Sequence, residues 1–217
     1  MNIYILLSAP VLGEVSATTE KERITLCENC NIKELTFKNA SLLLDKWNGE
    51  DLISALGQFF ISERLKAKFD SLEIAYQATS FDVILKKPSE KYKNQSLKFY
   101  RVIFKNVCRG FLDPWFEFIS KCEVCEREKW MMDTDGYTSS ANPNLIGEDI
   151  KNPAPRNVYK NSWKGENAFL LQDEYNFPIV TQSFVDILIG LGVKINEKGG
   201  VWLRPTDWID ENKNIIE

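Results

Sequence analysis

The sequence predicts an α+β protein: a single domain of two similar strand–helix–strand lobes with a mixed or antiparallel sheet, joined by a four-cysteine zinc site. Three observations support this: short strand-like apolar segments outnumber the two amphipathic helices, the second helical unit repeats the first, and four cysteines form two C-x-x-C pairs. We expect lobe one over residues 1 to about 110, the knuckle and a loop over about 111–165, and lobe two over about 166–217.

The chain opens with an apolar run that predicts a first strand over Asn2–Ser8. This run is too short to cross a bilayer, and no basic residue precedes it as in a secretory signal. We therefore expect a cytoplasmic protein that does not bind membranes. Lys33–Lys38 alternates like a short strand, and Glu50–Gly57 predicts a helical turn.

The first helix follows a short strand at Phe59–Ile61. Ser62 is a good N-cap, and Leu65 and Phe69 begin an apolar stripe at helical spacing. Two strand-like runs come next, at residues 81–86 and 97–105, with a polar stretch between them. They predict a hairpin with a long loop.

Residues 133–157 are rich in turn-forming residues and predict a loop. Order resumes with a strand over Phe177–Val180, and Thr181 is the expected N-cap of a second helix. Gly190 and Gly192 would end that helix. A final strand is predicted over residues 201–209.

The two helical units match at a constant offset of 119 residues. Ser62 and Thr181 occupy the same position, as do the apolar residues Leu65 and Phe184. A repeat of this kind predicts two similar lobes. The alternative is that any strand–helix–strand unit produces such a match, since strands and amphipathic helices share simple patterns.

Cysteine spacing gives the most specific chemical signal: Cys27 with Cys30, and Cys122 with Cys125, form two C-x-x-C pairs. Four thiolates from two such pairs suit a closed tetrahedral zinc site, which is structural because no coordination position is open. Metal-free thiols and a redox motif are the alternatives. Glutamates around both pairs disfavour a reactive thiolate, and 91 residues between the pairs would make the zinc a long-range link. Cys108 reads as a small buried hydrophobe.

The chain of 217 residues has no histidine, which excludes histidine-dependent catalytic triads, general bases and metal ligands. Carboxylate pairs at residues 133 and 135, 148 and 149, and 173 and 174 read as solvated loop charges, so we expect no enzyme activity. A net charge of −4 argues against binding to nucleic acids. Trp163, flanked by lysines, is a candidate interface anchor, although a half-buried position is the ordinary alternative.

The paired C-x-x-C motifs, the segment Ile61-Ser62-Glu63-Arg64-Leu65 and the segment IVTQSFVDILIGLGVK resemble the double-CXXCG motif immunity proteins. The resemblance extends over most of the chain through short motifs. It implies a member of a polymorphic toxin system that binds and neutralises a cognate toxin, with the four paired cysteines as metal ligands. Asn31 and Glu126 stand where the motif has glycine, and Glu tolerates a left-handed backbone less well than Asn.

Two other functions are open at this stage. The first is a zinc-ribbon module that binds nucleic acid or regulates another protein, which would need a basic face. The second is a thiol oxidoreductase, which would need a thiolate of low pKa. The toxin and the surface that binds it are not encoded in a recognisable motif, and neither is the oligomeric state.

Overall fold

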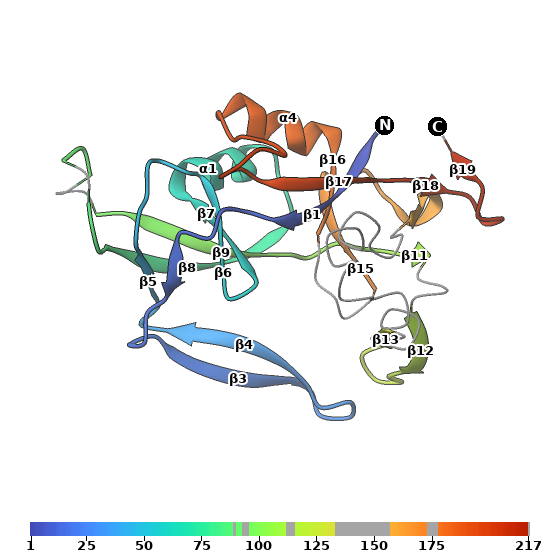
Figure 1. The fold of residues 1–217 in the computed structure, drawn as a ribbon. Coiled ribbons are helices and arrows are strands. Elements are labelled where there is room, and N and C mark those ends of the chain that lie inside the picture. The colour runs from blue at the N-terminus through green and yellow to red at the C-terminus, as the bar shows by residue number, and fades with distance from the viewer. Residues whose placement is uncertain (89, 93–95, 112–115, 133–156, 173–177, 217) are drawn as a thin grey trace, which may run out of the picture.

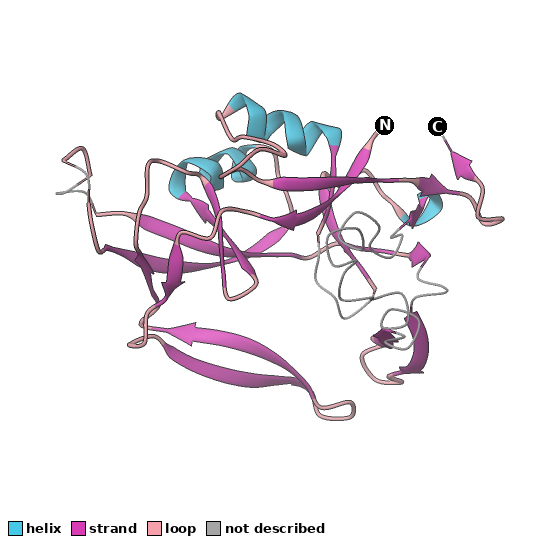
Figure 2. Ribbon diagram, in the orientation of Figure 1, coloured by secondary structure: helices cyan, strands magenta, loops and turns pink. Residues whose placement is uncertain are grey.

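The computed structural model describes residues 1–88, 90–92, 96–111, 116–132, 157–172 and 178–216. Strands dominate this part of the chain, and two short α-helices lie beside each other on one side of the sheets (Figure 2). A long hairpin lies on the opposite side of the sheets (Figure 1). The α+β class predicted from the sequence is confirmed by this mixture of sheets and helices.

The first sheet is built from the N-terminal half of the chain and has the order β2-β5-β8-β9-β7-β6. Only β5 and β8 pair in parallel, so the sheet is mixed. The strands are β2 (Gly13–Val15), β5 (Ser41–Leu44), β6 (Leu52–Ala55), β7 (Gln58–Ser62), β8 (Tyr76–Leu85) and β9 (Lys98–Phe104).

The second half of the chain forms two smaller sheets, ordered β10-β15-β16-β1-β17 and β11-β14-β18-β19. β1 (Ile3–Ser8), from the beginning of the chain, lies between β16 and β17 and pairs antiparallel with both. The other strands are β10 (Val107–Cys108), β11 (Gly110–Phe111), β14 (Asn157–Tyr159), β15 (Ala168–Leu171), β16 (Ile179–Thr181), β17 (Trp202–Thr206), β18 (Trp208–Ile209) and β19 (Ile215–Ile216).

Two antiparallel hairpins stand apart from these sheets. One joins β3 (Glu20–Cys27) to β4 (Ile32–Lys38), and the other joins β12 (Phe116–Lys121) to β13 (Glu128–Met132). The turn of the first hairpin points toward the second hairpin in Figure 1. These hairpins carry the four paired cysteines.

The helices α1 (Glu63–Ser71) and α4 (Gln182–Gly190) begin where the sequence predicts. The Ser62 side chain accepts a hydrogen bond from the Leu65 amide, and the Thr181 side chain accepts one from the Phe184 amide, so each caps its helix. η1 is a short 3₁₀-helix over Lys160–Ser162. No helix in the described ranges is long and apolar enough to cross a membrane.

Three clusters of buried side chains form the core. The largest lies under the two helices and joins them through Phe69 and Phe184, whose ring centroids are 5.1 Å apart. A second cluster fills the sheet around β5, β7 and β9, and a third packs around β1, β15 and Trp208. Because the largest cluster draws on both halves of the chain, the two halves share one core.

The helical turn predicted over Glu50–Gly57 is wrong. β6 and β7 form a hairpin there, and the turn residues Leu56 and Gly57 both have positive φ angles, of 51° and 68°. Two consecutive residues in this conformation produce a tight two-residue turn that matches the twist of the strands. The hairpin strands predicted around residues 81–86 and 97–105 are confirmed as β8 and β9. The loop predicted over residues 133–157 lies almost wholly outside the described residues.

A recurring turn and a recurring strand order

One turn occurs twice, at Trp47-Asn48-Gly49-Glu50 and at Trp163-Lys164-Gly165-Glu166. In each turn the indole Nε1 donates to the glutamate carbonyl oxygen, at 2.9 and 2.8 Å. The glutamate carboxylate accepts from the amide that follows the tryptophan, at 2.7 and 2.8 Å. The glycines have φ angles of 103° and 102°, which only glycine adopts without strain.

The residue after each of these turns bonds to a helix cap. Asp51 accepts from the Ser62 amide at 2.8 Å, and Asn167 accepts from the Thr181 amide at 3.0 Å. Both helices also end alike, since the Ile74 amide donates to the Phe69 carbonyl and the Val193 amide donates to the Leu188 carbonyl. These bonds satisfy the last carbonyls of each helix.

The strand pairings recur as well. A single residue separates β17 from β18, so the two strands can be treated as one long strand that corresponds to β8. The order β2-β5-β8-β9-β7-β6 of the first sheet then has a counterpart in β11-β14-β18/β17-β1-β16-β15. Each pair has the same direction in both sets: only β5 with β8 and β14 with β18 are parallel.

Candidate metal centre

The two cysteine hairpins reverse direction at their C-x-x-C motifs. Cys27 ends β3 and pairs with Ile32 across the first turn, and the Cys122 amide donates to the Arg127 carbonyl across the second turn at 2.9 Å. Asn31 and Glu126, which follow the motifs, have positive φ angles of 52° and 56°. Both positions that the sequence flagged as lacking glycine therefore have a left-handed backbone.

The structure brings all four predicted cysteines together. Cys27 Sγ lies 3.8 Å from Cys122 Sγ, and Cys30 Sγ lies 3.6 Å from Cys125 Sγ. All four sulfur atoms lie within 4.8 Å of one another, and none forms a disulfide. In a sulfur tetrahedron with metal–sulfur bonds of about 2.3 Å the edges are about 3.8 Å long. The four thiols could therefore hold a metal ion.

Burial is the same in the two hairpins. The first cysteine of each motif, Cys27 or Cys122, is buried, and the second, Cys30 or Cys125, is exposed. The ligands contributed by the two hairpins therefore match position by position, 95 residues apart. A metal ion held by all four thiols would join segments that are distant in the chain.

Hydrogen bonds around Cys122 favour its thiolate. The amides of Cys125 and Val124 and the Asn29 side chain, whose Nδ2 lies 3.5 Å from Cys122 Sγ, lower the pKa of Cys122 to about 6. Desolvation, followed by the neighbouring thiols, raises the pKa of Cys30 to about 12. The surroundings of Cys122 therefore favour the thiolate form that a metal binds, whereas a metal must displace the proton of Cys30.

Basic residues surround the cluster. A cavity of about 590 Å³ lies beside the cysteines, between the two hairpins, and we call it the inter-hairpin cavity. Among the described residues that line it, one is a carboxylate, Glu128. Four are cations: Lys33, Lys121, Arg127 and Lys129. A tetrahedral zinc bound to four thiolates carries a charge of −2, which these cations can offset.

The other candidate functional residues either pack within the fold or lie outside the described residues. Cys108 is buried, and its burial raises its pKa to about 12. Trp163 packs against Trp208, with ring centroids 5.2 Å apart, so it is half-buried within its turn and not exposed as an anchor. The three carboxylate pairs considered above lie outside the described residues.

Sequence reasoning missed the repeated Trp-x-Gly-Glu turn, although its signal is in the sequence. Trp47 and Trp163 are 116 residues apart, and the glycine and glutamate that follow keep the same spacing. The offset of 119 at the helices hides this match because three more residues separate the turn from the helix in the second copy. Comparison with known proteins identified no matching family model, curated protein or solved structure.

Proposed function

We propose that the chain is an immunity protein that binds a cognate bacterial toxin domain in a stoichiometric complex and has no catalytic role of its own. The four-cysteine cluster is the observation that carries this proposal: it joins two hairpins through thiols alone, so a bound metal has no position left for a substrate. A metal held there would therefore stabilise the structure and would not take part in catalysis. The resemblance of the cysteine and helix motifs to double-CXXCG immunity proteins names the partner class.

Structural zinc is the proposed metal. Four sulfur ligands at tetrahedral separations suit zinc, and iron is the other metal that such a set accepts. Elemental analysis of protein purified without a metal-affinity tag should find one zinc per chain. A stoichiometric content of iron, with its visible absorption, would refute the zinc assignment.

Two similar lobes are the proposed architecture. The recurring turns, helix caps and strand order all support two copies of one structural unit, each with a cysteine hairpin inserted after its first strand. β1 supplies to the second copy the strand that β9 supplies to the first. In this arrangement the four cysteines lie where the two copies meet.

Co-expression tests the function directly. The protein encoded by the neighbouring gene should arrest growth when produced alone, and this chain should restore growth and co-elute with it in equal amounts. If growth is not restored and no complex forms, the chain is not an immunity protein for that neighbour. Cys125→Ser, which disrupts the metal site at an exposed position, should weaken the complex.

A zinc-ribbon module that binds nucleic acid or regulates another protein is the second candidate function. The four cations of the inter-hairpin cavity favour it, because phosphate groups bind clustered lysine and arginine. Retardation of labelled DNA or RNA at low salt, abolished by Lys121→Glu and Lys129→Glu together, would support this function. Unretarded nucleic acid at 50 mM salt would exclude it, since nonspecific binding is strongest at low salt.

A further inference from the structure

A second cavity, of about 520 Å³, opens between the β3–β4 hairpin and the outer face of the first sheet. We call it the basic cleft. Its apolar lining includes Leu26 and Leu35 of the hairpin, Phe59, Ile103, Val107 and Leu170. Leu26 and Val107 are 52% and 57% exposed, which leaves substantial apolar surface open to water.

Four cations line the same cleft: Lys33, Arg101, Lys105 and Arg127. Among the described residues that line the cleft, Glu34 is the one carboxylate, so these residues carry a net charge of +3. The net charge of the chain is −4, which leaves −7 on the rest of the protein. The electrostatic character of the cleft is therefore opposite to that of the remaining surface.

Arg101 is the clearest sign that an anion belongs here. Its residue is only 6% exposed, and its guanidinium donates to Gln58 Oε1 at 3.0 Å and to the Leu35 carbonyl at 2.9 Å. Both acceptors are neutral, and no carboxylate in the described part of the chain forms an ion pair with it. The charge of Glu34 acts on Arg101 without an ion pair between them. A buried cation that no carboxylate pairs with directly is costly, and a bound carboxylate would offset that cost.

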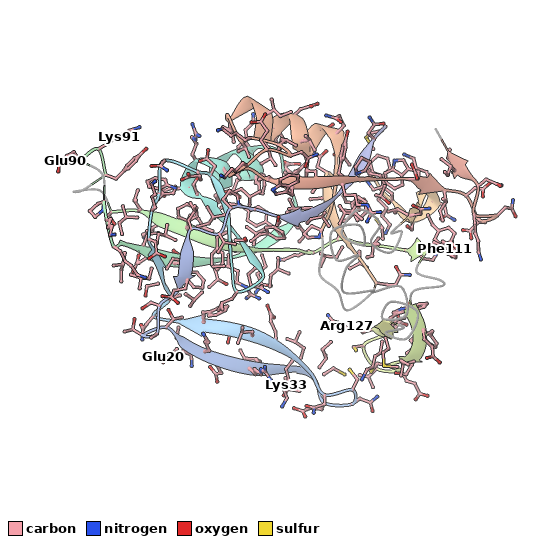
Figure 3. All side chains as sticks on the ribbon, in the orientation of Figure 1. Glu20, Lys33, Glu90, Lys91, Phe111 and Arg127 are labelled. Carbon is pink, nitrogen blue, oxygen red and sulfur yellow. The ribbon has the colours of Figure 1, made fainter. Side chains whose placement is uncertain are left out.

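The metal centre adjoins the cleft. Lys33 and Arg127 line both the basic cleft and the inter-hairpin cavity, and Figure 3 shows them on the two hairpins near the sulfur atoms. These two cations can serve the metal thiolates, but Arg101 and Lys105 line the basic cleft and not the other cavity. The charge of the metal site therefore does not account for them.

We propose that the basic cleft binds an acidic segment of a protein partner, with an apolar side chain between Leu26 and Val107 and carboxylates on the surrounding cations. This deepens the proposed function, because it assigns the toxin-binding surface and the chemistry of the segment it accepts. The mainly aliphatic lining favours a peptide over a nucleic acid, since bases bind by stacking on exposed aromatic faces. The acidic net charge of the chain would instead have suggested a basic partner surface.

Fluorescence anisotropy with three labelled probes tests the cleft without the toxin. The probes are a peptide with Leu-Phe between two runs of Glu and Asp, the same peptide with Gly-Gly in place of Leu-Phe, and a single-stranded RNA of similar length. We expect the first probe to bind the metal-loaded protein most tightly, with affinity that falls as salt is added. Tighter binding of RNA than of the peptide, or no binding of the peptide, would overturn the proposal.

Variants locate the binding. Lys105→Glu with Val107→Ser changes two exposed cleft residues and should weaken binding of the first peptide by about tenfold or more. Lys46→Glu with Val11→Ser is the matched control, since both residues are exposed and neither lines the cleft. Equal affinity of the two double variants would refute the cleft as the binding site.

The same variants separate this proposal from the function on which it rests. If the wild-type chain forms the toxin complex and Lys105→Glu with Val107→Ser does not weaken it, the cleft proposal fails and the immunity function stands. If the peptide binds the cleft but no toxin complex forms, the immunity function fails and the cleft is a peptide site.

Discussion

Loss of the metal should detach the two cysteine hairpins and lower the stability of the whole protein. Cys125→Ser is the sharpest perturbation, because Cys125 is exposed and its replacement removes a ligand without opening a cavity in the core. The cysteines that face each other in the cluster are 95 residues apart. A covalent link that closes a loop of this length restricts the unfolded chain by about 4–5 kcal/mol, which sets the upper limit for a metal link.

Urea denaturation and thermal melts of metal-loaded wild-type protein and of Cys125→Ser, all under reducing conditions, measure this difference. For a chain of this size a loss of 1 kcal/mol lowers the melting temperature by about 2–4 °C, so a reduction of about 10 °C is expected. A chelator should destabilise the wild type to the level of the variant and should leave the variant unchanged. If metal-loaded wild type and Cys125→Ser unfold at the same urea concentration, the cluster does not stabilise the fold.

Three further predictions concern individual groups. Glu50→Ala and Glu166→Ala should each cost about 1 kcal/mol in urea denaturation, because each carboxylate satisfies an amide of its turn; a large cost at only one of them would contradict two equivalent turns. The protein should retain less metal as pH falls, because the raised pKa of Cys30 makes protons compete with the metal for this sulfur. A chromogenic chelator would follow the release of metal between pH 8 and 5, and constant retention over this range would contradict the prediction. Burial raises the pKa of Cys108 to about 12, whereas hydrogen bonds lower that of Cys122 to about 6, so Cys108 should react with a thiol reagent at pH 8 more slowly than Cys122 of the chelated protein. Faster labelling of Cys108 than of Cys122, seen by mass spectrometry of the labelled peptides, would contradict this.

Features determined by neighbouring residues were predictable from the sequence. Ser62 and Thr181 cap their helices because a hydroxyl at that position reaches an amide three residues ahead, which depends on no distant contact. The four cysteines of the cluster could also be identified from the sequence, since two closely spaced cysteine pairs are a specific signal for metal binding. Their assembly across 95 residues was an expectation that spacing alone could not establish.

Features determined by distant contacts were not predictable. The run Leu52–Ala55 is buried at every position, so it has no alternation to distinguish a strand from a helix, and pairing with β7 decides its conformation. The basic cleft is assembled from many short segments between Leu26 and Pro178, and no local pattern marks them as neighbours. The net charge of the chain does not reveal the positive charge of the cleft either, because the cations that form it are far apart in the sequence.

The position of β1 has a consequence for the order in which the protein can fold during synthesis. β1 lies between β16 and β17 in its sheet, so its partners are made more than 170 residues after it, and its pairing is complete only after Thr206 has left the ribosome. The first sheet, by contrast, needs nothing beyond Phe104. Until β16 and β17 have been synthesised, the apolar residues Ile3, Ile5 and Leu6 of β1 have no strand to pair with. β1 is thus synthesised well before the strands that pair with it, and a nascent chain stalled before β16 would leave it exposed to aggregation.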